Sequence, residues 1–363
     1  MKKIFLFFFL ISLSLNSQSK FPSNYFSNPL DSDLILNGTF GELRSSHFHS
    51  GIDFKTRFKE GLEVYSSADG YVSRISIKHG GFGKALYINH PNGYTTVYAH
   101  LKNFNKEIED YIKALQYRKK SYQIERYLKK DELKVLKNQV IGSSGNTGSS
   151  FGPHLHFETR KTSNQKALNP KLFKFKIKDT RSPYVSSVYF YKFDSLNNRS
   201  KPYEIKLKKI NDSLIMADEL SLDGRLAFGL AGFDRQGMAM NKNGIYKFSS
   251  FFNENKNIEF KFDSFFFEES IKIKTLIDYE FYVKNKKRIV KLFKDSGNNL
   301  SIYNNNNSGI IEIKNPINEY KIEVSDFDGN KTVIIIPIKK TKSDYFLNIK
   351  DETFETNTEI KNN

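Results

Sequence analysis

The sequence predicts a mainly β protein, in which an N-terminal β-sheet domain with a helical insertion is followed by a β-sandwich. Three observations predict this class. Short runs of alternating apolar and polar residues, typical of strands, recur through both halves of the chain. Turns that contain Gly, Asn or Asp separate these runs. Residues 103–141 instead contain no Gly or Pro, and part of this stretch repeats its apolar residues at helical spacing.

Length and composition exclude several classes of protein. The chain has 363 residues, enough for two domains, and its apolar fraction of 38% supports ordinary hydrophobic cores. It contains no cysteine, which excludes disulfide bonds and a lipid anchor on cysteine. The formal net charge of +17 favours contact with polyanions. Because the basic residues are scattered along the chain, we do not expect a nucleic-acid partner.

Residues 1–19 have the pattern of a secretory signal peptide. A basic start, Met1 to Lys3, precedes an apolar run from Ile4 to Leu15, and small polar residues follow. The apolar run is shorter than the roughly 20 residues that a membrane-spanning helix needs. We therefore expect an exported protein, periplasmic or extracellular in the cell envelope, without a membrane span after signal cleavage.

The elements of the first domain, residues 20–175, follow from local patterns. Residues 71–77, 85–88 and 95–100 alternate as strands, and the Asn-Gly pair at 92–93 predicts a hairpin between the last two. Apolar residues at helical spacing predict an amphipathic helix over 105–119. A strand is expected after it, so that an insertion covers about 103–135.

The sequence pattern changes after residue 176. The stretch 179–183, Asp-Thr-Arg-Ser-Pro, indicates a domain boundary. Residues 227–237 and 320–330 echo each other weakly, since each is a strand that runs into a turn with Asp and Gly. We predict a β-sandwich (Ig-like) over 176–345, in one or two units, and a polar tail over 346–363. This half contains no histidine, and we expect it to bind the cell wall or an envelope protein partner.

The candidate chemistry lies in the first half, which holds all seven histidines. In a strand, His154 and His156 project from one face, while Leu155 and Phe157 point to the other. Taken alone, this pair is equally consistent with two surface histidines on an edge strand.

A second segment, His-Phe-His-Ser-Gly-Ile-Asp at 47–53, supplies possible partners for this pair. In an extended strand His49 and Asp53 would be roughly 13 Å apart, so we expect Gly51 to bend the chain and bring them together. With one histidine of the pair they make a two-His, one-carboxylate set that leaves a coordination position open, as in catalytic zinc sites. Calcium or magnesium would prefer more oxygen ligands.

A further histidine, His100, ends the predicted strand at 95–100. It is either a hydrogen-bonded residue at a strand end or part of the site. A water attacking an amide needs a proton acceptor and a group that stabilises the oxyanion. His100 and the non-ligating histidine of the pair could fill these roles, with His154 favoured as the base and the two roles exchangeable.

In order and spacing, these pieces resemble the lysostaphin/LytM-type zinc endopeptidases, metallopeptidase family 23. The matching pieces are HSGID (49–53), ADGYV (68–72), GGFGKALYINHPNGYTTVYAHL (80–101), VIGSSGNTGSSFGPHLHFETR (140–160) and Leu-Asn-Pro (168–170). The resemblance covers roughly 36–172 and implies a β-sheet peptidase domain of the LytM type. It also implies that His49, Asp53 and His156 bind Zn2+, and that His100 and His154 act on water and the transition state.

Several features near the motifs are not fixed by the resemblance. The insertion after His100 departs from compact family members and could shape or cover the groove. Many relatives carry an upstream Asn that blocks the zinc, and Asn37 precedes the motif here without a clear alignment. Arg44 and His47 flank the site and could contact substrate, although a surface or supporting role is expected for His47. His79 and His90 are assigned to turns, with no role.

The sequence therefore predicts an exported zinc metalloendopeptidase that hydrolyses the peptide cross-links of peptidoglycan. The alternative is a non-catalytic LytM-type binding or activator protein for cell-wall hydrolysis, built on the same scaffold. All five polar residues of the site are present, namely His49, Asp53, His100, His154 and His156. This argues against the alternative, because inactive members usually lack one or more ligands.

Overall fold

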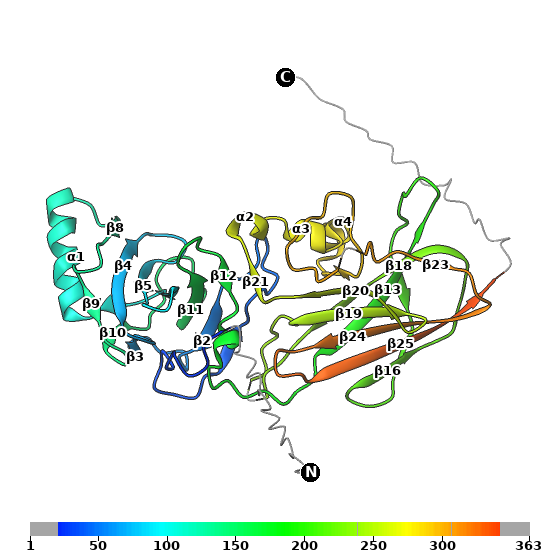
Figure 1. Cartoon of the computed structure of the whole chain (residues 1–363), viewed down its shortest axis with the longest axis horizontal. Helices are drawn as coiled ribbons and strands as arrows, with labels where there is room; N and C mark the ends of the chain where they lie inside the picture. The colour runs from blue at the N-terminus through cyan, green and yellow to red at the C-terminus, as the bar shows by residue number, and fades with distance from the viewer. Residues whose placement is uncertain (1–20, 238, 306, 342–363) are drawn as a thin grey trace, which may run out of the picture.

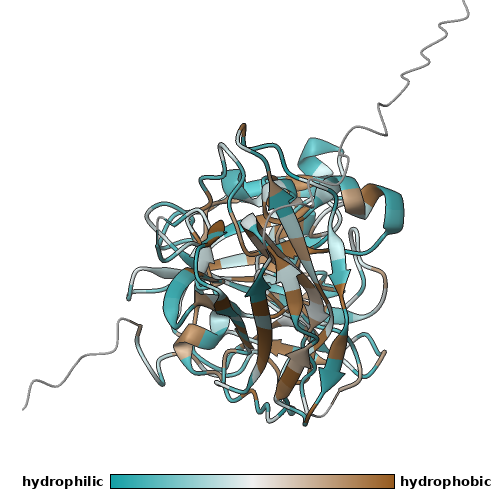
Figure 2. Cartoon of the chain, turned by 90° about the vertical axis from the view of Figure 1, so that its right-hand side faces the viewer, coloured by the Kyte–Doolittle hydropathy of each residue, from teal (hydrophilic) through white to brown (hydrophobic). Residues whose placement is uncertain are grey.

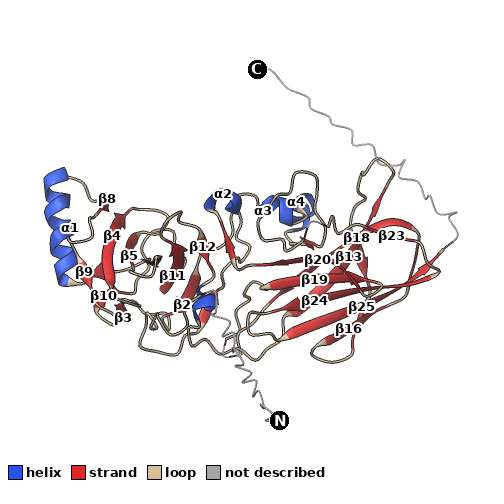
Figure 3. Cartoon of the chain, in the orientation of Figure 1, coloured by secondary structure: helices blue, strands red, loops and turns tan. Residues whose placement is uncertain are grey.

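A computed structural model of the chain describes residues 21–237, 239–305 and 307–341. The predicted signal peptide (1–19) and polar tail (346–363) lie outside these residues. The described part is mainly β, as predicted. Its two halves lie side by side along the longest axis of the molecule, and most of the regular structure consists of strands (Figures 1 and 3).

The N-terminal half is built on one large antiparallel sheet. Its central path runs β1-β2-β11-β6-β5-β4-β8, and β9, β12 and β21 pair at its margins. The strands are β1 (Leu36–Gly38), β2 (Ile52–Lys55), β4 (Gly70–Ile77), β5 (Lys84–Asn89), β6 (Tyr94–Ala99), β8 (Ile124–Tyr127), β9 (Lys134–Val135), β11 (His154–Lys161), β12 (Ala167–Leu168) and β21 (Ser264–Phe265). A second, three-stranded sheet has the order β3-β10-β7, from β3 (Glu63–Tyr65), β7 (Asn103–Phe104) and β10 (Val140–Ser143).

The predicted hairpin is confirmed, and a helix forms within the segment predicted as an insertion. Strands β5 and β6 pair in antiparallel register, and Gly93 in their turn takes the left-handed φ of +83° that glycine favours. Helix α1 (Lys106–Lys119) begins after Asn105, whose side chain accepts a hydrogen bond from the Ile108 amide. It buries Ile108 and Ile112, and β8 follows it at the edge of the sheet. The insertion thus extends the margin formed by β4 and β8, four strands away from β11.

The C-terminal half is a sandwich of two sheets. The first has the order β14-β13-β18-β22, with β23 also paired to β18; the second has the order β15-β16-β25-β24-β19-β20, with β17 also paired to β25. The first comprises β13 (Tyr184–Phe193), β14 (Tyr203–Ile205), β18 (Gly224–Phe233), β22 (Val290–Lys291) and β23 (Ile311–Ile313). The second comprises β15 (Leu207–Lys209), β16 (Leu214–Ala217), β17 (Leu220–Leu222), β19 (Lys247–Phe252), β20 (Asn255–Lys261), β24 (Ile317–Ser325) and β25 (Lys331–Lys340).

Alternation of side chains explains why these two sheets face each other. On β24 every second residue from Asn318 to Val324 is buried, which is the pattern of a strand with one face on a core. Hydrophobic and hydrophilic segments alternate along the strands in Figure 2. Phe228 of the first sheet stacks on Tyr320 of the second with ring centroids 4.0 Å apart. The predicted sandwich is therefore present, whereas its Ig-like character stays a prediction.

Short helices in this half were not predicted from the sequence. They are α2 (Phe267–Ser270), α3 (Ile273–Leu276) and α4 (Tyr279–Asn285), and the 3-10 helix η1 (Pro170–Phe173) lies just before the predicted boundary. Even the longest of them, α4, has only seven residues. Such helices are too short for a periodic apolar pattern to be recognised in the sequence. Within the described residues, no helix has the length and apolar character needed to cross a membrane.

Contacts cross the predicted boundary between the halves. Strand β21, from the C-terminal half, pairs with β12 of the peptidase-like sheet through Ala167 and Phe265. Phe40 and Phe48 belong to the same hydrophobic core as the sandwich residues, and the Phe48 amide donates to Ser270 Oγ. The N-terminal and C-terminal halves therefore share buried surface and are not joined only by a free linker.

Candidate metal centre

Strand register places the predicted ligands next to one another. In the antiparallel pairing of β11 with β2, His156 lies opposite Asp53, and on its other side β11 pairs with β6, where His156 lies opposite Ala99. Both Leu155 and Phe157 are fully buried, as the alternation in the strand predicted. The central position of β11 rules out the edge-strand interpretation of the histidine pair.

His49 reaches the same point from the loop before β2. Gly51 permits this by close approach and not by an unusual backbone angle, since a Cβ there would lie 2.4 Å from the Phe157 carbonyl oxygen and 3.0 Å from a ring carbon of His156. The prediction that the side chains of His49 and Asp53 converge is confirmed. The interpretation of Gly51 as a bend changes to that of a gap that a larger residue would fill.

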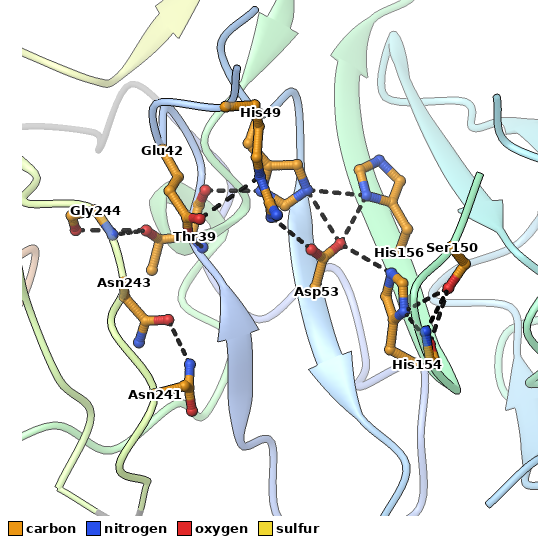
Figure 4. A network of polar contacts seen from close by, with 12 residues as sticks. Thr39, Glu42, His49, Asp53, Ser150, His154, His156, Asn241, Asn243 and Gly244 are labelled. Atoms are coloured by element: carbon orange, nitrogen blue, oxygen red, sulfur yellow. Dashed lines mark hydrogen bonds and ion pairs between the residues drawn. The ribbon is translucent and has the colours of Figure 1, made fainter. Parts of the chain in front are cut away.

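Three ligand atoms form a compact triangle. His49 Nε2 lies 3.0 Å from Asp53 Oδ1 and 3.0 Å from His156 Nδ1, and His156 Nδ1 lies 2.9 Å from Asp53 Oδ1. All three residues are at least nine-tenths buried. Figure 4 shows them pointing toward one another, with His154 beside them.

The hydrogen bonds on the far side of each ring show which nitrogen carries the proton. His49 Nδ1 lies 2.8 Å from the Thr39 carbonyl oxygen, which can only accept. His156 Nε2 lies 3.0 Å from Glu158 Oε1, also an acceptor. The nitrogens that face the triangle are therefore unprotonated in the neutral rings, so two lone pairs and a carboxylate oxygen converge on one point.

This donor set fits a cation. Zinc holds N and O ligands at about 2.0–2.2 Å in tetrahedral geometry, which puts neighbouring ligand atoms roughly 3.3 Å apart, close to the observed spacing. The residues would leave one tetrahedral position for another ligand. His49, Asp53 and His156 are also one of two groups among the described residues whose ligand atoms lie within 4.8 Å of one another.

The charges and hydrogen bonds of the side chains themselves also favour a cation at this site. Burial raises the pKa of Asp53, but the charge of His49 and hydrogen bonds from His154, His156 and His49 outweigh it and hold that pKa well below its usual value. Burial opposes protonation of His156, yet hydrogen bonds that its ring donates to Asp53 and Glu158 raise its pKa to about 9. The centre therefore attracts positive charge, which a proton or a metal ion can supply.

His154 and His100 lie beside the triangle. His154 Nε2 is 3.5 Å from Asp53 Oδ1, while its Nδ1 is 2.8 Å from the Gly152 carbonyl oxygen. His100 follows β6 with a left-handed φ of +60°, and its Nδ1 is 2.8 Å from the Thr147 carbonyl oxygen. The two rings are 4.8 Å apart between centroids. Burial and the charges of His156 and His154 lower the pKa of His100 to about 3.

Two supporting residues, Glu158 and Thr39, had no role assigned from the sequence. Glu158 is fully buried and accepts hydrogen bonds from His156, Ser50 and Arg160. Burial raises its pKa, but the Arg160 and His156 contacts dominate and lower it to about 2. Thr39 acts through its backbone, which no side-chain pattern reveals. Glu158 could have been found, because it continues the two-residue spacing of His154 and His156.

Arg44 was expected near the site, and it contacts a predicted ligand directly. Its Nη2 lies 2.8 Å from Asp53 Oδ2, the carboxylate oxygen outside the triangle. His47 is exposed and contacts Ser46, while Asn37 is exposed on β1. Arg44 therefore fixes the orientation of the Asp53 carboxylate.

The two histidines assigned to turns differ from each other. His79 is exposed and stacks on Tyr122, with centroids 5.3 Å apart. His90 is buried and bridges the Asp69 carbonyl oxygen and Thr96 Oγ1, at 2.8 Å each. Both lie outside the metal centre, as predicted.

Comparison with known proteins places these motifs in a family. The sequence model of peptidase family M23 matches residues 47–118 and 115–170. The DD-carboxypeptidase/endopeptidase Mpg of Neisseria meningitidis is 34% identical over 128 residues, which cover 35% of this chain and 23% of that protein. The peptidoglycan DD-endopeptidase ShyA of Vibrio cholerae is 36% identical over 110 residues, covering 30% of this chain and 20% of that protein.

Solved structures are also similar to part of the chain. A zinc-containing peptidase from Vibrio cholerae is 27% identical and covers 43% of this chain and 41% of its own, with a TM-score of 0.30. The matched segment spans less than a quarter of the length of the two curated relatives. Residues 47–170 of this chain therefore match the sequence model of peptidase family M23.

Proposed function

We propose that this protein is an exported zinc metalloendopeptidase that hydrolyses the peptide cross-links of peptidoglycan. The observation that carries the proposal is the convergence of two imidazole lone pairs and one carboxylate oxygen within 3.0 Å of one another. A relative named as a peptidoglycan DD-endopeptidase and one named as a DD-carboxypeptidase/endopeptidase support the substrate class. The apolar start of the sequence supports export.

His49, Asp53 and His156 would hold the zinc. When bound, zinc lowers the pKa of a coordinated water toward about 7 and polarises the carbonyl that is attacked. Thr39 and Glu158 keep the two imidazoles in the tautomer that presents a lone pair inward. Arg44 keeps one oxygen of Asp53 turned toward the histidines.

His154 and His100 would move the protons. Each donates its Nδ1 proton to a backbone carbonyl, which leaves Nε2 of the neutral ring as a proton acceptor. We assign His154 as the base because its Nε2 lies beside Asp53. A histidine that has accepted the proton can then donate to the oxyanion or to the leaving amine. His100 would stabilise the oxyanion once its Nε2 has taken up a proton, and the two roles are exchangeable in this arrangement.

The test is digestion of purified sacculi by the purified chain, with and without a chelator, followed by mass analysis of the released fragments. We expect peptide-bond cleavage that the chelator abolishes and added zinc restores. His49→Ala should abolish release, whereas the matched control His79→Ala, outside the site, should release fragments at the wild-type rate. Unchanged release by folded His49→Ala would refute the proposal.

The same assay addresses the non-catalytic alternative. A binding or activator protein would sediment with sacculi and release nothing by itself, with zinc present or absent. The presence of all five polar residues in one buried cluster supports the catalytic proposal over this alternative.

A further inference from the structure

A second group of acidic side chains lies where the two halves of the molecule meet. Asp179, Asp234 and Asp326 each present a carboxylate oxygen within 4.8 Å of the other two. Asp234 is the first residue after β18, and Asp326 is the first residue after β24, so they come from the two facing sheets of the sandwich. Asp179 lies in the segment that enters the sandwich from the peptidase domain.

This cluster accounts for the weak sequence similarity between residues 227–237 and 320–330. Both segments end a strand with an aspartate at the same end of the sandwich, so the two aspartates meet across the core. The junction with the peptidase domain is close by. Gln236, two residues after Asp234, accepts from the Leu36 amide and donates to the Leu34 carbonyl.

Two of the three carboxylates accept hydrogen bonds from other segments or side chains, whereas Asp234 has only the backbone amide of the adjacent Arg235. Asp326 accepts from the backbone and side-chain amides of Asn330, and Asp179 accepts from the amides of Arg181 and Gly237. Asp234 is only 4% exposed, and its buried Oδ1 has no hydrogen-bond partner. An unpartnered buried carboxylate oxygen is costly unless a proton or a cation meets it.

The charge balance around the cluster is negative. Burial, together with the charges of Asp179 and Asp326, raises the pKa of Asp234 to about 7. The nearby cation Lys171 is already bound to a fourth carboxylate, with its Nζ 2.6 Å from Asp328 Oδ2. One ammonium group cannot neutralise four carboxylates.

There is also space for an ion. A small cavity of about 20 Å³ beside the cluster is lined by Asp179, Asp234, Lys171 and Asn169 and by other residues of both halves, but not by Asp326. A volume of this size holds roughly one water molecule or one ion. It is far too small for an organic ligand.

We propose that Asp179, Asp234 and Asp326 bind a calcium ion that fastens the sandwich to the peptidase domain. Oxygen-only ligands drawn from three separate loops match the preference and tolerance of calcium, whereas magnesium demands a near-ideal octahedron and zinc favours nitrogen or sulfur. The ion would coordinate the unpartnered Oδ1 of Asp234. It would also link both sheets of the sandwich to the segment that contains Asp179. This site is separate from the histidine centre.

The test is calcium binding by the full-length chain under saturating zinc, so that the histidine centre does not take up the added metal. Equilibrium dialysis should give one calcium per chain, and thermal unfolding should shift upward by several degrees when calcium is added. Asp234→Asn and Asp326→Asn should weaken binding by at least roughly tenfold and remove the shift. Asp212→Asn, an exposed carboxylate of the same domain, should behave as wild type.

A stability measurement without calcium separates a ligand from a merely structural residue. Asp234→Asn keeps the shape of the side chain and removes a repelling charge, so its melting temperature without calcium should equal or exceed that of wild type. Wild-type protein that takes up no calcium at up to about 10 mM, above the range of weak extracellular sites, would overturn the proposal. So would an Asp234→Asn variant that binds calcium as tightly as wild type, or stabilisation by magnesium alone.

Discussion

At the residue scale, the metal centre depends on groups that hold its ligands and do not themselves face the metal. Glu158 accepts the Nε2 proton of His156 from a fully buried position. Such a carboxylate behind a ligating imidazole fixes the tautomer and increases the electron density on the opposite nitrogen. Glu158 is in turn held by Ser50 and Arg160.

Replacing Glu158 by Gln should therefore weaken zinc binding without removing a ligand. The side chain keeps its size but loses its charge, and its amide can turn a donor toward His156. We expect the zinc affinity to fall by about 10–100-fold, measured by competition with a chromogenic chelator on folded protein.

A matched control is Glu125→Gln, which removes a surface carboxylate that pairs with Lys78 at 2.9 Å. It should bind zinc as tightly as wild type. Equal zinc affinities for the two variants would contradict the supporting role of Glu158.

The ligand residues themselves were predictable, and most of their supports were not. Histidine and aspartate are typical zinc ligands, and the spacing of His154 and His156 in a strand indicated a common face. The partner of His49 is a backbone carbonyl, which any residue at position 39 would supply. Arg44 lies in a loop, where spacing predicts no direction for the side chain.

At the element scale, the approach of β2 to β11 depends on Gly51. A methyl group there would lie within 2.4 Å of the Phe157 carbonyl and within 3.0 Å of His156. Because that contact is with backbone, the strands would have to move apart, which shifts the ligand on each. We expect Gly51→Ala to lower the free energy of unfolding by about 1–3 kcal/mol and to reduce zinc affinity.

Gly80→Ala serves as the control for this prediction. A Cβ at Gly80 meets only Ser149 Oγ, at 3.6 Å, and its φ lies outside the left-handed region. Chemical denaturation and zinc titration of both variants test the argument. A Gly51→Ala variant as stable as Gly80→Ala would show that the strands tolerate a wider separation.

His90, in the turn between β5 and β6, makes the stability of the fold depend on pH. Burial lowers the pKa of His90 to about 4, against hydrogen bonding to the Asp69 carbonyl that raises it. In the unfolded chain a histidine titrates near 6.5. The folded state therefore gains stability from a neutral His90 above pH 6.5 and loses it as the pH falls from 6.5 toward 4.

Linkage gives the size and the test of this effect. The loss between pH 6.5 and 4 amounts to about 3 kcal/mol at most. Urea unfolding of wild type and His90→Asn at pH 7 and pH 4.5 measures it, and the variant should lose less stability on acidification. His79→Asn, an exposed histidine, should follow wild type; a His90→Asn variant with the wild-type pH dependence would contradict the account.

At the scale of the whole molecule, the two halves stabilise each other. Phe40 and Phe48 belong to the core of the sandwich, and β21 adds to the peptidase sheet through β12. A chain ended at residue 175 would expose these side chains and leave β12 without its outer neighbour. We expect this truncated chain to aggregate or to melt at a lower temperature than the full chain.

Differential scanning calorimetry of the full chain, beside a solubility and activity assay of residues 20–175, tests the coupling. One cooperative transition is expected for the full chain. Two well-separated transitions, together with a soluble and fully active fragment, would mean that the shared core contributes little. Binding of the wall or an envelope partner by the C-terminal half stays a prediction that needs the intact protein.

The sequence predicted the elements better than their arrangement. The hairpin at Asn92-Gly93 follows from turn chemistry, and the helix after Asn105 from apolar residues at helical spacing, each within a few residues. The pairing of β21 with β12 joins residues almost a hundred positions apart, and local alternation says nothing about which strands meet. The short helices of residues 267–285 form against the sandwich and lack a periodic pattern long enough to read.

The central claim is that His49, Asp53 and His156 hold one zinc ion. Anomalous diffraction at the zinc edge, from crystals of the full chain grown with zinc, tests it most directly. We predict a single strong peak at about 2.0–2.2 Å from His49 Nε2, Asp53 Oδ1 and His156 Nδ1. A peak bound by other residues, or no peak in crystals of folded protein saturated with zinc, would contradict the account.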